Sequence, residues 1–123
     1  MTSLFNRRFR VRRYECDALG HVNNAVYIQY LEQTTEEALA AAGLAPDQSR
    51  GLADARRTLQ QLAIEYLLPA RPRDELNAQC WVQAVQDGEL KMGYDLRRDA
   101  DGALIARAEA VWQGVDQPPT IPD

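Results

Sequence analysis

The sequence has little of what metal centres and disulfide-stabilised folds are built from. It contains one histidine, His21, and two cysteines, Cys16 and Cys80, which lie far apart in the chain. A structural zinc site takes four nitrogen or sulfur ligands, so these three residues cannot form one, and no metal is expected. A chain of 123 residues can build its own core without disulfide bonds. Both cysteines are therefore expected to be free thiols.

Long apolar segments and glycine-rich loops are missing as well. No stretch approaches the ~20 apolar residues that span a bilayer, so no membrane insertion is expected. Residues 1–8 lack the apolar run of a secretory signal, which makes the cytoplasm the expected location. The seven glycines form neither a dinucleotide-binding fingerprint nor a P-loop. The length predicts one domain over residues 1–123.

The charge balance is negative overall but uneven. A net charge of -4 disfavours nucleic-acid binding. The beginning of the chain is nevertheless crowded with arginines, namely Arg7, Arg8, Arg10, Arg12 and Arg13. We interpret them as the solvated face of a strand, and contacts with a phosphorylated ligand are the alternative.

Alternating apolar and polar residues predict five strands. These are expected at residues 5–14, 62–68, 76–84, 90–96 and 104–112. Asp87-Gly88 and residues 99–102 are typical of tight turns between the last three strands. Residues 45–55 are expected to form a polar loop, and the prolines after residue 117 mark a tail outside the sheet.

Residues 24–42 carry one apolar face at helical spacing. That face consists of Tyr27, Tyr30, Leu31, Thr34, Ala38 and Ala41. Asn23 or Asn24 can cap the start of the helix, and Gly43 can supply the left-handed residue just past its end. A helix of this length spans roughly 28 Å and is the longest predicted element.

Strands joined by tight turns are antiparallel neighbours, and their single apolar faces need one covering layer. We therefore predict an α+β fold in which a curved, five-stranded antiparallel sheet wraps around one long helix. The predicted inner face includes Tyr66, Leu68 and Ala84. The outer face also carries apolar residues, namely Trp81, Val85, Ile105, Val111 and Val115. Pairing with a second copy would hide them, so we expect a homodimer, with a dimer of dimers left open.

A polar, glycine-bearing turn leads into the helix. The first turn of a helix has unpaired N–H groups and a positive dipole end, which together stabilise negative charge. An N–H aimed at a carbonyl oxygen that gains charge in a transition state can contribute ~3 kcal/mol. In thioester hydrolysis the leaving thiol has a pKa of about 8.5, so no strong general acid is needed. Asp17 would attack the carbonyl or deprotonate the attacking water, and both roles stay open.

The turn and the helix carry the pattern Asp17-x-x-Gly20-His21-Val22-Asn23-Asn24-x-x-Tyr27, followed by Tyr30-Leu31-Glu32. A second segment reads Ile64-Glu65-Tyr66-Leu67-Leu68-Pro69-Ala70-Arg71-Pro72-x-Asp74-Glu75-Leu76. Together they resemble the hotdog thioesterases of the 4-hydroxybenzoyl-CoA and acyl-CoA thioesterase family. The resemblance covers nearly the whole chain. It implies a hotdog domain that hydrolyses acyl-CoA without metal or other cofactor, with an active site shared across a dimer interface.

The resemblance also assigns roles to residues. Asp17 is implied as the catalytic carboxylate, and the backbone N–H of Asn24 as the oxyanion donor. Another subgroup of the superfamily uses a glutamate on the helix, which makes Glu32 the reserve carboxylate. In plant acyl-carrier-protein thioesterases an asparagine stands where this chain has Leu19, so His21 is a candidate without a fixed role. A hydrogen-bonded structural imidazole is the alternative for His21.

The remaining site residues are candidate substrate contacts. They are Gly20, Asn23, Tyr27, Glu32 and Lys91. Each of three residues also has a structural alternative. Tyr27 could belong to the core beneath the helix, Glu32 could be a solvated helix residue, and Lys91 could be an ordinary surface charge. Lys91, Arg71 and Arg73 are candidates for the nucleotide phosphates of CoA. Cys16 is not expected to act as a nucleophile, because no third orienting group accompanies it and His21.

Two other functions stay open beside the hydrolase. One is a non-catalytic module that binds acyl-CoA or an acyl carrier protein on the same fold. The other is a hotdog dehydratase or hydratase that uses Asp17 and His21. The substrate is expected to be an acyl-CoA or acyl-carrier-protein thioester, and the sequence does not predict its acyl group.

Overall fold

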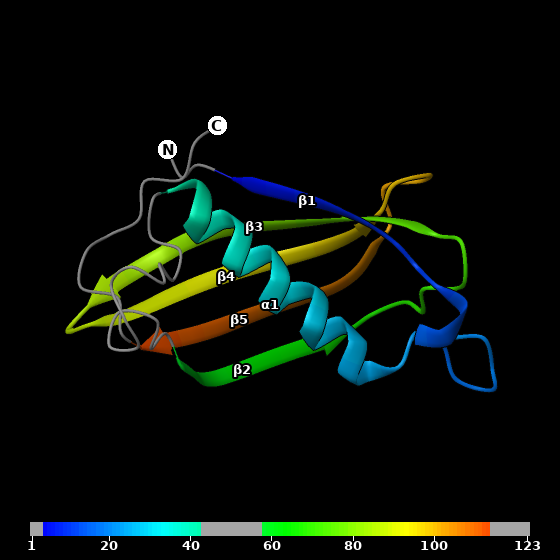
Figure 1. Cartoon of the computed structure of the whole chain (residues 1–123), viewed down its shortest axis with the longest axis horizontal. Helices are drawn as coiled ribbons and strands as arrows, with labels where there is room; N and C mark the ends of the chain where they lie inside the picture. Colours follow the sequence, from blue (N-terminus) through cyan, green and yellow to red (C-terminus); the bar gives the residue numbers. More distant parts are fainter. Residues whose placement is uncertain (1–3, 43–57, 114–123) are drawn as a thin grey trace.

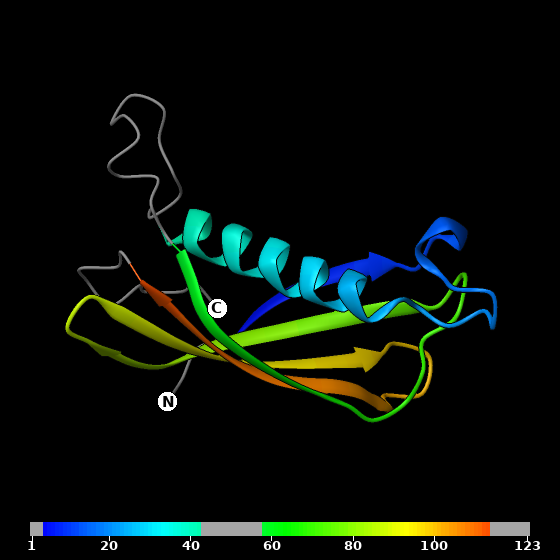
Figure 2. The same ribbon diagram turned by 90° about the horizontal axis from the view of Figure 1, so that it is seen from below.

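The computed structural model describes residues 4–42 and 58–113 (Figure 1). Its elements in chain order are β1 (Phe5–Arg10), the 3-10 helix η1 (Arg13–Glu15), α1 (Asn24–Ala41), β2 (Thr58–Tyr66), β3 (Glu75–Gln86), β4 (Glu89–Arg98) and β5 (Leu104–Gln113). The strands form one sheet in the order β1-β3-β4-β5-β2, and every neighbouring pair is antiparallel. The helix lies along one face, and the sheet curves around it (Figures 1 and 2). The predicted hotdog architecture is confirmed.

The two predicted tight turns are present. Asp87 and Gly88 both have positive φ angles, 54° and 77°, as the two central residues of a type I′ hairpin turn require. The turn between β4 and β5 closes through hydrogen bonds from Arg98 N to Ala103 O and from Gly102 N to Arg98 O, each 2.8 Å long. These turns bring β3, β4 and β5 together as a meander beneath the helix.

The core fills the space between α1 and the inner face of the sheet. The helix buries Tyr27, Tyr30, Leu31, Thr34, Thr35, Ala38 and Leu39. The sheet opposes them with fully buried side chains such as Leu76, Met92 and Leu96. Ala41 was expected on the buried face and is exposed.

Two β-bulges move side chains to the face opposite the expected one. The register of β3 and β4 shifts between Val82 and Ala84, so Ala84 is exposed and Val85 packs against the core. A second shift, opposite the start of β5, leaves Ile105 fully buried. The prediction that Val85 and Ile105 lie on the outer face of the sheet and Ala84 on its inner face is therefore wrong. A bulge adds one residue and reverses the alternation beyond it.

The ends of the first two strands differ from the expected ones. β1 stops at Arg10, where the predicted strand ran to residue 14, and η1 follows it. β2 ends at Tyr66, so Leu68 lies beyond the strand, where it is exposed. Tyr66 is exposed as well, but its ring lies 5.4 Å from that of Tyr27 and therefore on the side of the helix, as expected. Gly43, the loop at 45–55, Val115 and the proline tail lie outside the described residues. Among residues 4–42 and 58–113, no helix is long and apolar enough to cross a membrane.

Candidate active site

The start of α1 presents one unused backbone donor. Asn23 is the cap: its Oδ1 accepts a hydrogen bond from Ala25 N, and its carbonyl oxygen accepts one from Val26 N, both 2.9 Å long. Within the described residues, the N–H of Asn24 has no acceptor. It therefore lies free at the positive end of the helix dipole, where it can stabilise an anionic oxygen.

Asp17 sits in a short loop held by its own hydrogen bonds. Its Oδ1 accepts from Leu19 N at 2.9 Å and from His21 N at 3.1 Å. Asp17 N donates to His21 O at 2.8 Å, and Gly20 N donates to Asp17 O at 3.0 Å. Gly20 has a φ of 76°, a left-handed conformation that glycine adopts without strain. One carboxylate oxygen is thereby fixed in place while the side chain stays exposed.

Asp17 and the helix start line the same pocket, with a volume of about 280 Å³. Its lining comprises Asp17, His21, Val22, Asn24, Tyr27, Tyr66, Leu67, Leu68 and Pro69. The structure therefore brings together four of the residues that the sequence singled out, Asp17, His21, Asn24 and Tyr27. The segment that follows β2 completes the wall. It belongs to the second motif of the resemblance, but its residues were not among the predicted site residues.

Two tyrosines shape this pocket. Tyr27 is buried at its floor, where its hydroxyl accepts a hydrogen bond from Ala70 N at 3.0 Å. Burial raises the pKa of Tyr27 above its usual value, so the hydroxyl stays protonated. Tyr66 stands at the wall with its ring 5.4 Å from that of Tyr27, and its hydroxyl donates to Asn24 O at 3.3 Å. Tyr66 thus ties β2 to the first residue of the helix.

A second and larger pocket, about 790 Å³, opens on the other side of Asp17. It is lined by Val11, Arg13, Cys16, Asp17, Ala18, Gly20, Pro72 and Arg73. Asp17 and its loop therefore separate a small pocket at the helix start from a larger one that contains two arginines. Gly20, a predicted substrate contact, lies in the larger pocket.

Cys16 is a poor nucleophile in this setting. Burial raises the pKa of its thiol, and the neighbouring carboxylates of Glu15, Asp17 and Asp74 raise it further. The thiolate is the reactive form, so a raised pKa reduces reactivity. Both cysteines are free, as expected.

Three predicted contacts are placed elsewhere. Asn23 uses its side chain for the helix cap. Glu32 is exposed along the helix and lines neither pocket around Asp17. Lys91 lies near the start of β4, at the end of the sheet far from the start of α1, with its Nζ 3.9 Å from Glu109 (Figure 1). Within a single chain, neither Glu32 nor Lys91 joins the site.

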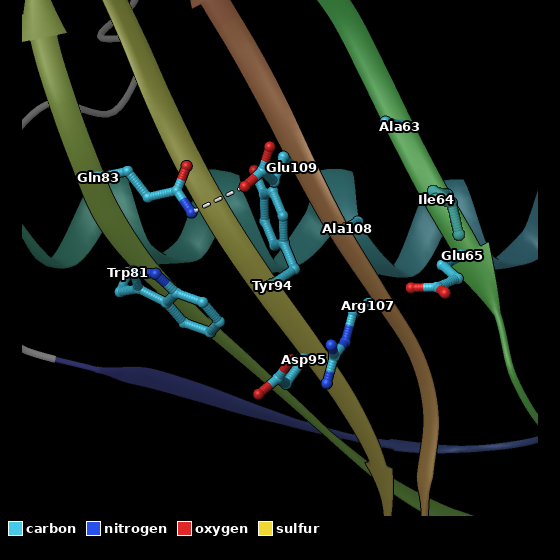
Figure 3. A pocket seen from close by; sticks show the side chains of 10 residues that line it. All are labelled: Ala63, Ile64, Glu65, Trp81, Gln83, Tyr94, Asp95, Arg107, Ala108 and Glu109. Carbon is cyan, nitrogen blue, oxygen red and sulfur yellow. Dashed lines mark hydrogen bonds between the residues drawn. The ribbon is translucent and has the colours of Figure 1, made fainter.

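A third hollow, about 520 Å³, lies on the outer face of the sheet (Figure 3). The indole of Trp81 and the charged side chains of Asp95, Arg107 and Glu109 surround it, and Gln83 donates a 3.4 Å hydrogen bond to Glu109. None of the predicted site residues lines it. Among the described residues, no group of three or more His, Cys, Asp or Glu is placed to hold a metal ion.

Comparison with known proteins agrees with this fold. Residues 11–123 match the model of the thioesterase-like superfamily, and the chain belongs to that family. The resemblance of the chain to the hotdog thioesterases is confirmed.

Individual relatives are distant in sequence. The chloroplastic acyl-acyl carrier protein thioesterase ATL3 of Arabidopsis thaliana is 25% identical over 114 residues, which cover 91% of this chain and 60% of that protein. The chain thus spans three-fifths of the length of this relative. The 1,4-dihydroxy-2-naphthoyl-CoA thioesterase of Synechocystis superposes with a TM-score of 0.80 at 18% identity, over 90% of this chain and 81% of that one. A Thermus thermophilus thioesterase solved with coenzyme A and zinc superposes with a TM-score of 0.77 at 23% identity, over 96% of this chain and 90% of that one.

Proposed function

We propose that the protein hydrolyses acyl thioesters, with Asp17 as the catalytic carboxylate and the N–H of Asn24 as the oxyanion donor. The observation that carries the proposal is that both groups line one pocket, the first exposed and the second without another acceptor in the described residues. Membership of the thioesterase-like superfamily supports the reaction class. The names of the relatives support both coenzyme A and acyl carrier protein as donors.

The reaction follows from this placement. As a nucleophile attacks the thioester carbon, the carbonyl oxygen gains negative charge, and the Asn24 N–H and the helix dipole stabilise it. The tetrahedral species then expels the thiolate and leaves the acyl group on the attacking oxygen. If water attacks, Asp17 takes its proton and the carboxylic acid forms directly. If Asp17 attacks, an acyl-aspartyl anhydride forms and a second step with water releases the acid.

A single turnover in ¹⁸O-labelled water tests the nucleophilic role of Asp17. Nucleophilic attack on the substrate, followed by hydrolysis of the anhydride at the aspartyl carbon, transfers one original oxygen of Asp17 to the acid and leaves ¹⁸O in the side chain of Asp17, which mass spectrometry of the peptide detects. Direct attack by water puts the label in the acid and leaves the peptide unlabelled, as does hydrolysis of the anhydride at the acyl carbon. A labelled peptide therefore establishes Asp17 as the nucleophile.

Asp17→Asn is the decisive variant. The amide oxygen can still accept from Leu19 N and His21 N, so the loop should keep its shape. Without a carboxylate, turnover should fall at least roughly 100-fold, the lower range for loss of a general base. Thiol release from aromatic, short-chain and long-chain acyl-CoA, measured with a colorimetric thiol reagent, gives the rate, and circular dichroism checks the fold.

Cys16→Ser is the matched control, because it changes a neighbouring pocket residue that we assign no chemical role. Near-normal turnover in Asp17→Asn would refute the assignment of Asp17. If the wild type releases no thiol but binds a non-hydrolysable thioether analogue saturably, the protein is a binding module instead.

We further propose that the working unit is a homodimer formed at β2. This strand is an edge of the sheet, and three exposed residues lie beside the pocket, namely Tyr66 at the end of β2 and Leu67 and Leu68 just after it. An unpaired edge with apolar side chains is a typical surface for association.

Leu68→Lys should shift the sedimentation coefficient to that of a monomer and lower thioesterase activity, while the exposed Ala100→Lys should change neither. A monomeric wild type at micromolar concentration would refute this assembly. A species twice the size of the dimer would show a dimer of dimers.

A further inference from the structure

Several exposed arginines near the Asp17 loop have no carboxylate partner among the described residues. Carboxylates of the described residues lie within salt-bridge distance of Arg7, Arg8, Arg97, Arg98 and Lys91. Within residues 4–42 and 58–113, the arginines without such a carboxylate partner are Arg10, Arg12, Arg13, Arg71, Arg73 and Arg107. All of these except Arg107 belong to the end of β1, to the segment around η1 and to the turn before β3. Their side chains are all exposed. These five arginines are called the basic surface below.

The carboxylates beside this surface in the chain, Glu15, Asp17, Asp74 and Glu75, are fewer than its five arginines. Glu15 accepts hydrogen bonds from the Tyr30 hydroxyl and from Arg12 N, both 2.8 Å long. Asp74 lies 3.4 Å from Arg98 Nε and accepts from Arg71 N at 3.0 Å. A chain with a net charge of -4 therefore exposes a local excess of positive charge. Such a field attracts an anionic partner and speeds its association.

Backbone hydrogen bonds join the parts of the basic surface to the site. Val11 N donates to Asp74 O at 2.9 Å, and Arg73 N donates to Val11 O at 3.0 Å. The turn before β3 is thereby held against the end of β1. Arg13 and Arg73 then line the 790 Å³ pocket together with Asp17. Asp17 therefore shares a pocket with two arginines of the basic surface.

The backbone of Arg73 is unusual for an arginine. Arg71 O accepts from Asp74 N at 3.1 Å, which closes a turn with Pro72 and Arg73 at its centre. Arg73 has a φ of 74° there, a conformation that glycine or asparagine normally supplies. Local stability therefore gives no reason for an arginine at this position. Strain of this kind is concentrated at functional sites.

Two large apolar side chains stand beside the arginines. Tyr14 is 81% exposed and Leu19 is 80% exposed, more than any other large hydrophobic residue among those described. Tyr14 lies in η1, and Leu19 lies in the loop of Asp17. Arginine and tyrosine are enriched where proteins bind one another, and apolar side chains rimmed by charge mark such surfaces.

From these observations we propose that the basic surface docks an acidic acyl carrier protein, whose flexible thioester arm reaches Asp17 between Arg13 and Arg73. The inference rests on the proposed function and names the donor of its substrate. A protein partner fits better than a nucleotide because the arginines spread over three chain segments and are interleaved with Tyr14 and Leu19. A nucleotide needs only a compact cluster of cations.

The test compares one acyl group on two donors, a bacterial acyl carrier protein and coenzyme A. Arg12→Gln and Arg73→Gly are made singly and together, and kcat/KM is measured for each donor at low and at physiological salt. The ratio of kcat/KM for the carrier thioester to that for the CoA thioester should fall about tenfold in the double variant. The wild-type ratio should fall as salt rises, because salt screens the steering charges. Arg73→Gly should not lower the melting temperature, since glycine relieves the backbone.

Arg107→Gln is the matched control, because Arg107 is an exposed arginine without a carboxylate partner among the described residues but lies on the outer face of the sheet (Figure 3). Arg107→Gln should leave kcat/KM unchanged for both the carrier thioester and the CoA thioester. An equal loss for both donors in the double variant would overturn the proposal and assign the arginines to the phosphate that both donors share. An unchanged ratio would also overturn it.

Direct binding keeps this inference separate from the proposed function. The affinity of the holo carrier protein is measured by isothermal titration calorimetry with wild type, Asp17→Asn and the double arginine variant. Docking predicts that Asp17→Asn binds like wild type and that the double variant binds about tenfold more weakly. If wild type hydrolyses neither thioester yet binds the carrier through these arginines, the proposed function fails and the docking surface stands. If the carrier does not bind to wild type, the docking surface is refuted.

Discussion

At the scale of single residues, Gly93 has a structural role that depends on one neighbour. It lies in β4 opposite Trp81 of β3, on the outer face of the sheet (Figure 3). A Cβ atom at position 93 would lie 2.5 Å from the Trp81 ring, far inside van der Waals contact. The indole therefore covers the glycine, and Trp81 can lie flat on the sheet only because position 93 has no side chain.

Gly93→Ala should accordingly displace the Trp81 ring and destabilise the protein by roughly 1–3 kcal/mol, the usual cost of overpacking. The fluorescence of Trp81, recorded in a Trp112→Phe background, should shift to longer wavelength as the ring becomes more solvated. In a Trp81→Ala background the same glycine substitution should cost almost nothing, because its clash partner is gone. Urea unfolding of the four variants measures this coupling. Additive costs would show that the glycine is needed for another reason.

The site shows what residue patterns in a sequence can reveal. Asp17, His21 and Asn24 lie within eight residues of one another, so their meeting at one pocket follows from local geometry. The wall formed by residues 66–69 could not be located in this way. Its place depends on the pairing of β2 with β5, a contact between distant segments. Lys91 was assigned by charge alone, and the direction of β4 carries it to the far end of the sheet.

At the scale of elements, a hydrogen-bond chain ties the helix to the sheet. Trp112 Nε1 of β5 donates to the Tyr94 hydroxyl of β4 at 3.0 Å. The oxygens of Tyr94 and Thr35 are 2.6 Å apart, and Thr35 donates to Leu31 O in α1 at 2.8 Å. Since Thr35 uses its only proton for Leu31, Tyr94 must donate to Thr35. The chain therefore runs in one direction, and each of its three side-chain donors has an acceptor.

Tyr94→Phe should break this chain at its centre. The side chain is fully buried, so its removal leaves the Trp112 N–H without its acceptor and the Thr35 oxygen without its donor. Unsatisfied buried polar groups cost about 1–3 kcal/mol each, so the variant should lose at least that amount in urea unfolding. Tyr14→Phe, at an exposed position, is the control and should be neutral. An unchanged free energy of unfolding in Tyr94→Phe would show that water replaces the hydroxyl.

The elements themselves were predictable because alternation and helical spacing are strong signals over long segments. The structure confirms three predictions from the sequence: the start of α1, the pairing of strands around Asp87-Gly88, and the helix that covers one face of the sheet. The bulges were not predictable. Nothing local in the sequence shows that Val85 and Ile105 change sides, because a bulge arises from the fit of two strands to a curved surface.

At the scale of the whole molecule, buried acidic groups make stability depend on alkaline pH. Burial raises the pKa of the Cys80 thiol from 9.0 to about 12. Burial also raises the pKa of Tyr94 from 10.0 to about 12, against the lowering effect of its hydrogen bonds with Thr35 and Trp112. Between these values the unfolded chain has lost protons that the folded protein keeps. The free energy of unfolding is therefore fully present below about pH 9 and decreases as the pH rises.

Urea unfolding at pH 8, 10 and 11 under reducing conditions should show this decrease. One pH unit within the window costs about 1.4 kcal/mol for each group, so the two groups together should lower the free energy of unfolding by roughly 4 kcal/mol at pH 11. Cys80→Ala should reduce the decrease between pH 8 and pH 10 more than Tyr94→Phe does, because the thiol titrates about one pH unit lower than the phenol in the unfolded chain. Tyr94→Phe should reduce the further decrease between pH 10 and pH 11. Stability that stays constant to pH 11 would mean that water reaches both groups, and the core between α1 and the sheet would then be more open than the packing of Cys80 and Tyr94 indicates.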